Sequence, residues 1–387
     1  MNQNEKLMRY CLELALKGSG FVSPNPLVGA LIAKDDKIIS EGWHKEYGDL
    51  HAEIEAINAA KKNGFSDFSD STLYVNLEPC SHLGKQPPCV DSIIETKIPN
   101  VVVGMKDPNP LVAGKGIEKL MAAGINVEVG VLEKDCCWIN RFFCNYITEG
   151  MPYVVLKIAQ TLDGCISTKD GESKWITCDE SRRRTHFLRS EMDAIMVGVN
   201  TIITDNPILD TRLLNSGGEA SNEDEKNIRK RNPKIIILDS HLKTPAHSKV
   251  LSSHKDGREV FIVYSDELEN NVDIDVKKRK ADLEIAGAIL WEAPLKDGKI
   301  HLRKAISRLT FEYCFTSLLV EGGAELFSSF INSELVNEMQ FFIAPMIMGD
   351  GKRAFCNLET DKLEEVRKFR LAGSFQSGLD EQLILIK

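Results

Sequence analysis

The chain has 387 residues and a formal net charge of −9, with 43% hydrophobic and 27% charged residues. This length exceeds what one hydrophobic core usually holds, so we expect a soluble protein of two domains. The acidic balance disfavours nucleic acid as a partner, because phosphate binding needs a basic surface. No apolar run approaches the roughly 20 residues that cross a bilayer, so no membrane association is expected.

The cysteines indicate the compartment. There are ten of them, and the N-terminus has no basic-then-apolar export signal. Cysteines in such a chain serve as metal ligands, nucleophiles or buried packing residues more often than they form disulfides. We therefore expect a cytoplasmic protein.

The first 150 residues alternate helical and strand-like segments. An amphipathic helix is expected at 5–17, and a turn at 23–26 leads into strands at 27–33 and 38–43. Further on we expect a helix at 51–62, a buried strand at 72–77, a helix at 88–96, strands at 101–104 and 124–129, and a helix over 133–147. This alternation predicts a three-layer α/β/α domain.

Four residues of this half suit a catalytic zinc ion. His51, Cys80 and Cys89 offer one imidazole and two thiolates, which leave the fourth tetrahedral position to water. Glu53 reaches the same site only if His51 lies in the first turn of its helix, because two residues rotate a helix by about 200°. Each residue alone is more often a helix start or a buried thiol. All four in this order, behind a strand, predict a zinc-dependent deaminase in which Glu53 moves protons.

The second half begins with a new apolar strand, 153–159, after a turn at 149–152. We therefore place the domains at 1–149 and 150–387. A helix is expected at 179–190 with Asp179 as its N-cap, and the basic run 182–184 on it favours a solvated face.

Residues 214–232 are polar and charged without periodicity, which predicts a flexible surface insertion. A strand at 234–238 follows, and two or three more lie within 252–297. Another strand then leads into Gly322 and Gly323, which open a helix whose backbone N–H groups can meet a pyrophosphate. No G-x-G-x-x-G follows a strand, so a Rossmann domain is not expected.

The string from Leu77 to Cys89, with eight residues between its two cysteines, resembles the deaminase domain of the bifunctional riboflavin-biosynthesis deaminase/reductase family. Residues 24–29 and 107–110 also resemble that domain. The segments 161–164, 198–207 and 318–328 resemble its reductase domain. Two positions depart from the family, which commonly has a histidine at Glu55 and a basic residue at Cys165.

The resemblance implies a cytidine-deaminase-like three-layer α/β/α domain followed by a dihydrofolate-reductase-like α/β domain. It implies Zn²⁺ and NADPH as cofactors and a small phosphorylated pyrimidine as substrate. The first reaction would be hydrolytic deamination of 2,5-diamino-6-(5-phosphoribosylamino)pyrimidin-4-one. Reduction of the ribosyl group to ribityl would follow, giving 5-amino-6-(5-phosphoribitylamino)uracil. A homodimer or homotetramer is also implied.

Site residues follow from the same resemblance. In the deaminase, Asn25 would hydrogen-bond the pyrimidine and His44 would line its pocket. Apart from the resemblance, the loop through Lys85 and Gln86 is long and polar, which makes His82 and Lys85 candidates for contact with the base or its phosphate. The reductase cofactor would meet Ala159, Trp175, Thr177, Thr201, Asp205, Ser240, Gly322 and Gly323. The reductase substrate would meet Lys157, Ser173, Arg189, Leu209, Arg212 and Glu321. The two arginines would hold the phosphate as charged forks, and either Lys157 or Asp205 would donate the proton.

Two alternatives remain at this level. A nucleoside or tRNA deaminase with an accessory domain would share the same zinc residues. A structural zinc in a binding module would need a fourth protein ligand, for which His44 and His82 are the candidates, and Glu53 would then be dispensable.

Overall fold

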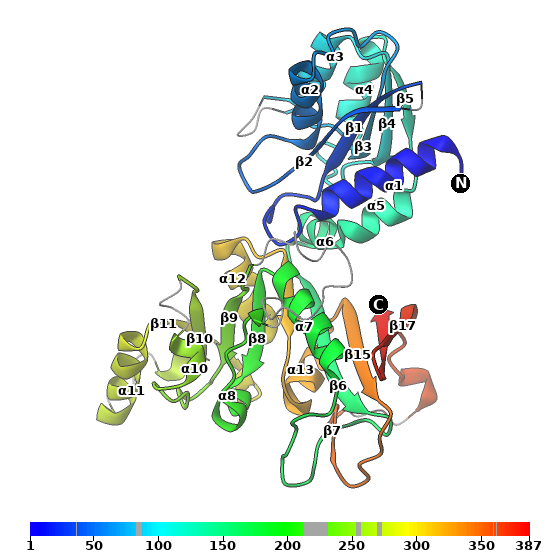
Figure 1. The fold of residues 1–387 in the computed structure, drawn as a ribbon. Coiled ribbons are helices and arrows are strands. Elements are labelled where there is room, and N and C mark those ends of the chain that lie inside the picture. Colours follow the sequence, from blue (N-terminus) through cyan, green and yellow to red (C-terminus); the bar gives the residue numbers. More distant parts are fainter. Residues whose placement is uncertain are drawn as a thin grey trace. The chain divides into compact units, whose positions relative to one another are not determined.

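The computed structural model describes residues 1–35, 37–82, 87–212, 231–252, 257–268, 273–358, 360 and 362–387. Lys85 and residues 214–230 of the expected insertion lie outside this part of the chain. The chain divides into two units, Met1–Met151 and Pro152–Lys387, each with a sheet of its own (Figure 1). Nowhere in the described part is there a helix with the length and apolarity of a membrane span.

The first unit is a five-stranded sheet in the order β2-β1-β3-β4-β5, with helices packed on its two faces. Its elements are α1 (Gln3–Leu16), β1 (Gly29–Lys34), β2 (Lys37–Trp43), α2 (Ala52–Lys62), β3 (Thr72–Leu77), α3 (Cys89–Thr96), β4 (Asn100–Met105), α4 (Lys115–Ala122), β5 (Asn126–Val129), α5 (Glu133–Ile139) and α6 (Arg141–Glu149). Strand β1 runs antiparallel to both β2 and β3, and β3, β4 and β5 are parallel.

Strand β3 shows why the unit has three layers. Side chains of a strand alternate between its two faces, and Leu73 and Val75 pack with residues of α2, α3 and α4. Tyr74, on the opposite face, packs instead with residues of α1 and α5. Both faces of the central strand are therefore buried, which confirms the predicted α/β/α arrangement.

The helix expected over 133–147 is two helices, α5 and α6, which break at Asn140. The Asn140 side chain accepts a hydrogen bond from the Leu27 N–H at 2.8 Å and donates one to the Leu27 carbonyl at 3.0 Å. These contacts with a segment 113 residues away in sequence hold Asn140 outside helical geometry. No local sequence pattern predicts them.

The second unit is built on a nine-stranded sheet in the order β11-β10-β9-β8-β14-β6-β15-β18-β17. Its strands are β6 (Tyr153–Thr161), β7 (Cys165–Ser167), β8 (Ala194–Gly198), β9 (Lys234–Leu238), β10 (Val260–Ser265), β11 (Ala288–Ala293), β12 (Leu295–Lys296), β13 (Lys299–Ile300), β14 (Ser317–Val320), β15 (Glu338–Ala344), β16 (Lys352–Arg353), β17 (Arg370–Ser377) and β18 (Asp380–Ile386). The helices are α7 (Asp179–Glu191), α8 (Val199–Asp205), α10 (Lys249–Ser252), α11 (Ile274–Ile285), α12 (Leu302–Tyr313) and α13 (Ala324–Asn332). Short 3₁₀ turns lie at Asp266–Leu268 and Leu363–Glu365.

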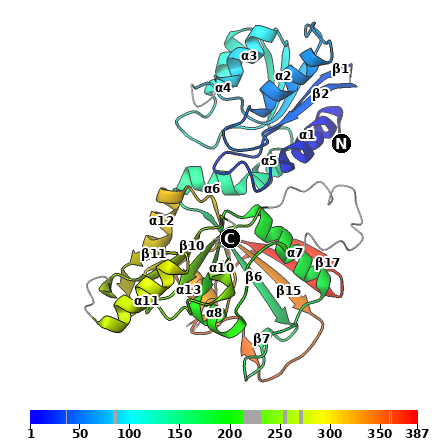
Figure 2. The same cartoon turned by 60° about the vertical axis from the view of Figure 1, so that its left-hand side comes forward.

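In this order the strands from β11 to β15 are parallel, and β18 and β17 continue the sheet antiparallel. Figure 2 labels β10, β11, β6, β15 and β17 of this sheet. In such a sheet, ligands bind in the crevice beyond the carboxyl ends of the parallel strands. The carboxyl ends of β8, β14 and β6, three adjacent parallel strands in the middle of the sheet, are therefore a place where a site is expected.

The expectation that Asp179 caps α7 is wrong. Cys178 is the N-cap, its side chain makes no capping bond, and Asp179 is the first helical residue. The Cys178 N–H is bound instead by the carboxylate of Asp380, 202 residues further along the chain, at 2.8 Å. Capping preferences read from a sequence are local, whereas this contact depends on the tertiary fold.

Candidate active sites

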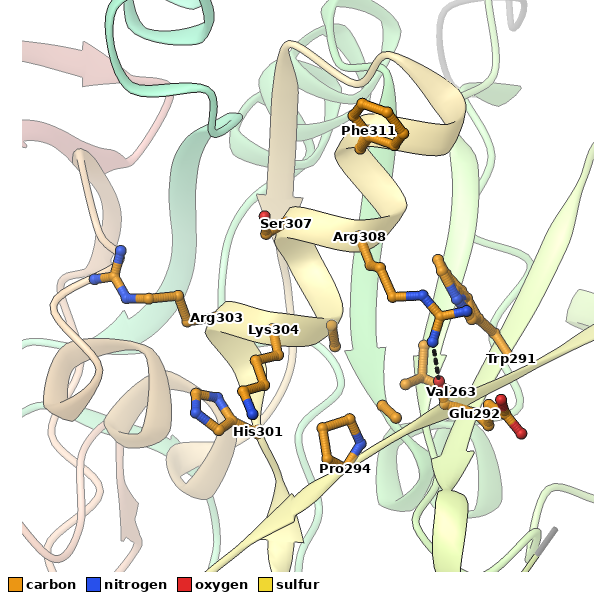
Figure 3. A pocket seen from close by; sticks show the side chains of 12 residues that line it. Val263, Trp291, Glu292, Pro294, His301, Arg303, Lys304, Ser307, Arg308 and Phe311 are labelled. Atoms are coloured by element: carbon orange, nitrogen blue, oxygen red, sulfur yellow. Dashed lines mark hydrogen bonds between the residues drawn. The ribbon is translucent and has the colours of Figure 1, made fainter.

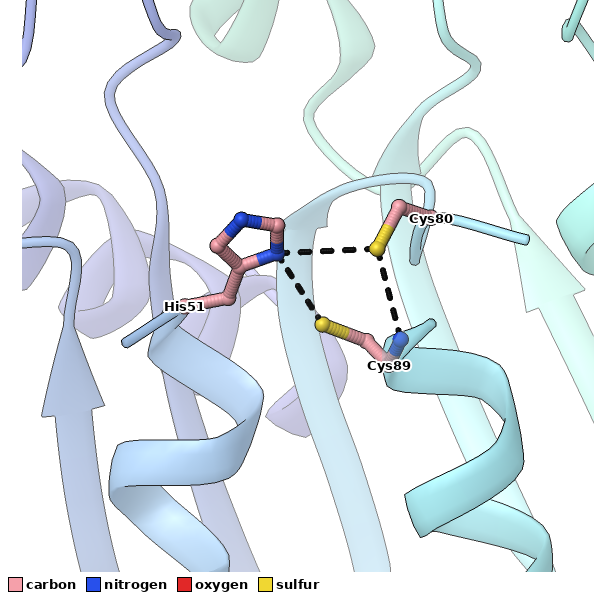
Figure 4. Close-up of side chains that lie close together, drawn as sticks. All are labelled: His51, Cys80 and Cys89. Carbon is pink, nitrogen blue, oxygen red and sulfur yellow. Dashed lines mark hydrogen bonds between the residues drawn. The ribbon is translucent and has the colours of Figure 1, made fainter. Parts of the chain in front are cut away.

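The three predicted zinc ligands meet in the first unit. His51 is the N-cap of α2, Cys80 follows β3, and Cys89 is the first residue of α3 (Figure 4). The His51 Nδ1 atom lies 3.1 Å from Cys89 Sγ and 3.5 Å from Cys80 Sγ. Among the described residues, these three form the one group of His, Cys, Asp or Glu donors arranged to hold a metal ion.

The donor set fits zinc. Ordinary Zn–N and Zn–S bonds in a tetrahedral site put the two ligand atoms about 3.6 Å apart, close to the His51–Cys80 separation of 3.5 Å. The Cys80 sulfur also accepts the Cys89 N–H at 3.3 Å. Hydrogen bonding from Cys89 and from His51 lowers the pKa of Cys80 to about 4, which favours the thiolate that a metal needs.

Glu53 lies beside these ligands in the first turn of α2 and is only 3% exposed. Burial, followed by the negative charge of Cys80, raises the pKa of its carboxyl to about 7. A group that both holds and releases a proton near neutral pH suits general acid–base work. The predicted requirement that His51 lie at the start of its helix is met, and it brings Glu53 to the same side.

Asn25 and His44 lie beside this cluster and contact each other. His44 is 2% exposed, and burial lowers its pKa, which favours the neutral imidazole. Its Nδ1 lies 3.1 Å from the Leu50 carbonyl, which requires the proton on that nitrogen. The Nε2 atom then accepts from the Asn25 amide at 3.1 Å. The His44 and His51 rings meet edge to face, 5.7 Å apart.

These contacts bear on the alternative of a structural zinc. Both ring nitrogens of His44 have partners, so neither is directed at the metal position. His82 is exposed and is not part of the ligand group. In the part of the chain that the structure describes, the cluster therefore offers three protein ligands to a metal ion, the number that catalytic zinc sites use. Glu55, where the family commonly has histidine, binds Lys45 at 2.7 Å.

The second unit contains a cavity of about 1060 Å³ at the carboxyl ends of β6, β8 and β14. All but one of the predicted reductase residues line it, namely Lys157, Ala159, Ser173, Trp175, Thr177, Arg189, Thr201, Asp205, Leu209, Arg212, Glu321, Gly322 and Gly323. The exception is Ser240, which follows β9 and whose carbonyl accepts the Ser265 N–H at 3.2 Å.

Arg189 already has a partner in this cavity. Its Nε and Nη2 bind the two Glu321 carboxylate oxygens at 2.7 and 2.8 Å, and its Nη1 donates to the Asp210 carbonyl at 3.0 Å. Arg212 is half-exposed and pairs with the Asp210 carboxylate. Of the two arginines predicted to hold a phosphate, Arg189 thus gives one whole edge of its guanidinium to Glu321.

Sequence reasoning missed Arg182 as a cavity residue, because the basic run that contains it favours a solvated helix face. The structure puts Arg182 among the lining residues, with its guanidinium 4.4 Å from the centre of the Trp175 ring. Its Nη1 also donates to the Thr177 carbonyl at 2.8 Å. His186 and Lys352 line the cavity too, and neither was predicted.

A second cavity of about 660 Å³ lies between β11 and α12 (Figure 3). The guanidinium of Arg308 lies 4.8 Å from the centre of the Trp291 ring and contacts the Glu292 carbonyl at 3.4 Å. None of the predicted site residues lines this cavity. We place neither activity there.

Known proteins resemble both units. The cytidine and deoxycytidylate deaminase zinc-binding region matches residues 1–105, and the RibD C-terminal domain matches residues 152–383. The riboflavin biosynthesis protein RibD of Aquifex aeolicus is 38% identical over 367 residues, which cover 95% of this chain and 94% of that protein. The chain belongs to the RibD family.

Solved structures of RibD proteins agree over almost the whole length. The diaminohydroxyphosphoribosylaminopyrimidine deaminase/5-amino-6-(5-phosphoribosylamino)uracil reductase of Thermotoga maritima has a TM-score of 0.82 and 34% identity, and the match covers 99% of this chain and 98% of that one. Acinetobacter baumannii RibD, form 1, has a TM-score of 0.81 and 32% identity, with coverage of 99% and 98%.

Membership of the RibD family makes this chain a bifunctional deaminase and reductase of riboflavin biosynthesis, with Zn²⁺ and NADPH as its cofactors. The expected order of a cytidine-deaminase-like domain followed by a dihydrofolate-reductase-like domain is confirmed.

Proposed function

We propose that His51, Cys80 and Cys89 hold the zinc ion and that Glu53 transfers the protons of the deamination. The substrate of this step is 2,5-diamino-6-(5-phosphoribosylamino)pyrimidin-4-one. In the second unit, the cavity at the ends of β6, β8 and β14 binds NADPH and the deaminated product, whose ribosyl group is reduced to ribityl. The observation that carries the proposal is the buried Glu53 carboxyl beside three converging metal ligands.

In the deaminase site, zinc supplies Lewis-acid activation of a water molecule. Glu53 accepts a proton from that water on its carboxylate and delivers it to the departing amine, which leaves as ammonia. The buried Glu53 carboxylate lies in the first turn of α2, next to the zinc ligands, where it can make both halves of this transfer. Asn25 and His44 hold the pyrimidine. Their mutual hydrogen bond fixes both side chains next to His51, where the pyrimidine must lie to react. His82 and Lys85 bind its polar substituents.

In the reductase site, NADPH supplies the hydride. Ala159, Trp175, Thr177, Thr201, Asp205, Ser240 and the two glycines after Glu321 bind the cofactor. Gly323 is the N-cap of α13 and has no side chain of its own, so backbone N–H groups there can approach a pyrophosphate. Lys157, Ser173, Arg189, Leu209, Arg212 and Glu321 bind the substrate. Lys157 and Asp205 both line the cavity, and either of them donates the proton.

Three further features belong to this proposal. The deaminase occupies residues 1–149 and the reductase residues 150–387, in line with a division of the structure at Met151. The protein works in the cytoplasm, which its ten free cysteines support. It assembles as a homodimer or homotetramer.

The first test follows NADPH absorbance with the diamino substrate, for the intact protein and for Glu53→Ala. We expect Glu53→Ala to slow NADPH oxidation by about 10²–10⁴-fold, because the proton transfer that precedes reduction is lost. The same variant should oxidise NADPH at the intact rate when 5-amino-6-(5-phosphoribosylamino)uracil is supplied directly. Its zinc content should be unchanged.

Two results would count against the proposal. Equal NADPH oxidation by both proteins with the diamino substrate would mean that reduction does not wait for deamination. Loss of zinc from Glu53→Ala would mean that the carboxylate holds the metal instead of moving protons.

A further inference from the structure

Glu78 directly follows β3 and lies two residues before the proposed metal ligand Cys80. It is 6% exposed, although a carboxylate is seldom buried without partners. The deamination proposed above does not use Glu78. Because its carboxylate is buried, groups inside the unit must supply its hydrogen bonds.

Four backbone N–H groups hold it. The Glu78 Oε2 atom accepts from Asp107 at 3.1 Å and from Gly114 at 2.9 Å. Its Oε1 atom accepts from Gly116 at 2.9 Å and from Ile117 at 3.4 Å. All four donors belong to the segment 107–117, which connects β4 to the first turn of α4.

The Glu78 carboxylate and the start of α4 each supply hydrogen-bond partners that the other lacks. The N-cap of α4 is Gly114, which has no side chain to satisfy the first N–H groups of the helix. Glu78 satisfies two of them, those of Gly116 and Ile117, from the turn after β3. Gly116 packs so closely against the turn after β3 that a Cβ atom there would overlap the Pro79 carbonyl oxygen. The turn that carries Cys80 is therefore tied to the segment 107–117 by hydrogen bonds and by close packing.

We propose that Glu78 is a positioning residue of the deaminase, which fixes the Pro79–Cys80 turn against the segment 107–117 and so holds Cys80 at the metal position. A carboxylate is required at this place, because only two acceptor oxygens satisfy four donors. A glutamine would turn an NH₂ group toward two N–H groups. Partners that orient metal ligands typically change metal affinity or activity by about 10–100-fold when they are replaced.

The test compares Glu78→Gln with Glu118→Gln. Both make the same chemical change, and Glu118 is an exposed residue of α4. Zinc release to a coloured chelator is timed at a temperature where both variants are fully folded, as judged by circular dichroism. We expect Glu78→Gln to release zinc about 10–100-fold faster than Glu118→Gln. Its kcat for ammonia release should fall in the same range, and reduction of the deaminated intermediate should stay at the intact rate.

Gly116→Ala provides an independent variant. It leaves the carboxylate in place but forces the segment 107–117 away from Pro79, so it should also speed zinc release. If Glu78→Gln does not fold, Gly116→Ala decides the question alone. Zinc release and ammonia release equal to those of Glu118→Gln would overturn the inference.

The inference rests on the proposed zinc site, and the two can fail separately. Intact protein that binds no zinc at His51, Cys80 and Cys89, or that releases no ammonia, refutes the proposed function. Intact protein that does both, with Glu78→Gln indistinguishable from Glu118→Gln, refutes the role of Glu78 alone.

Discussion

The Arg189–Glu321 pair shows how much one contact can contribute at the residue scale. The Arg189 and Glu321 side chains are only 11% and 13% exposed, and they share two charge-assisted hydrogen bonds. Glu321→Gln leaves the Arg189 charge buried with half of its acceptor gone. We expect the free energy of unfolding at pH 7 to fall by about 3–5 kcal/mol, as when one partner of a buried ion pair is removed. Urea unfolding followed by tryptophan fluorescence measures it.

Glu312→Gln is the matched control, because Glu312 pairs with Arg308 at 3.8 Å on an exposed helix face. That change should cost no more than about 1 kcal/mol. Equal losses from the two variants would contradict a special role for the buried pair.

The same pair predicts a pH dependence. Burial raises the pKa of Glu321, but the charge and hydrogen bonds of Arg189 outweigh burial and lower it from 4.5 to about 2. A carboxyl whose pKa is lower in the folded than in the unfolded chain stabilises the fold when the pH is above its unfolded pKa. The contribution of Glu321 is therefore complete above about pH 4.5 and is lost as the pH falls toward 2. The acid-induced loss of stability between these values should be smaller in Glu321→Gln than in the intact protein.

At the scale of elements, the packing of α2 on β2 positions the deaminase chemistry. Gly42 lies against the first turns of α2, where a Cβ atom would come within 2.5 Å of the Ala52 carbonyl oxygen and of the Ala56 nitrogen. Gly42→Ala should shift the start of α2, which carries His51 and Glu53. We expect a loss of about 1–3 kcal/mol of stability and a fall in ammonia release. Asn58→Ala, on the exposed side of α2, should change neither quantity.

The elements also show what sequence can and cannot predict. Strand β3 and helix α2 were predictable, because their apolar periodicity is local and strong. The convergence of His51, Cys80 and Cys89 was predictable for a related reason, since all three lie at or near the ends of predictable elements. The break at Asn140 and the N-cap at Cys178 were not, because each depends on a partner more than 100 residues away.

The residues of the reductase cavity were predictable, but their pairings were not. Sequence resemblance supplied residues for the reductase cavity, and nearly all of them line it. It could not supply their contacts with each other. The two oxygens of Glu321 are bound by Arg189, and Arg182 lies over Trp175, because helix α7 packs beside the ends of β8 and β14. Such pairings arise only when the sheet has formed.

At the scale of the whole molecule, the two activities should separate on metal removal. The structure divides into two units, and the metal-ligand group of the described residues lies in the first. Treatment with a zinc chelator should abolish ammonia release and leave NADPH oxidation with the deaminated intermediate intact. Readdition of Zn²⁺ should restore ammonia release. A reductase that fails together with the deaminase would show that the second unit also depends on the metal.

The reductase cavity concentrates positive charge in an acidic protein. Its lining includes the basic side chains of Lys157, Lys174, Arg182, Arg183, Arg189, Arg212, Lys249 and Lys352, and the acidic ones of Asp179, Asp205 and Glu321. The whole chain carries −9. A phosphorylated ligand is therefore repelled by the molecule at long range and attracted at the mouth of the cavity. Salt screens both fields over about 8 Å at physiological ionic strength, so the capture rate of the cofactor depends on the balance between the two fields at a given salt concentration.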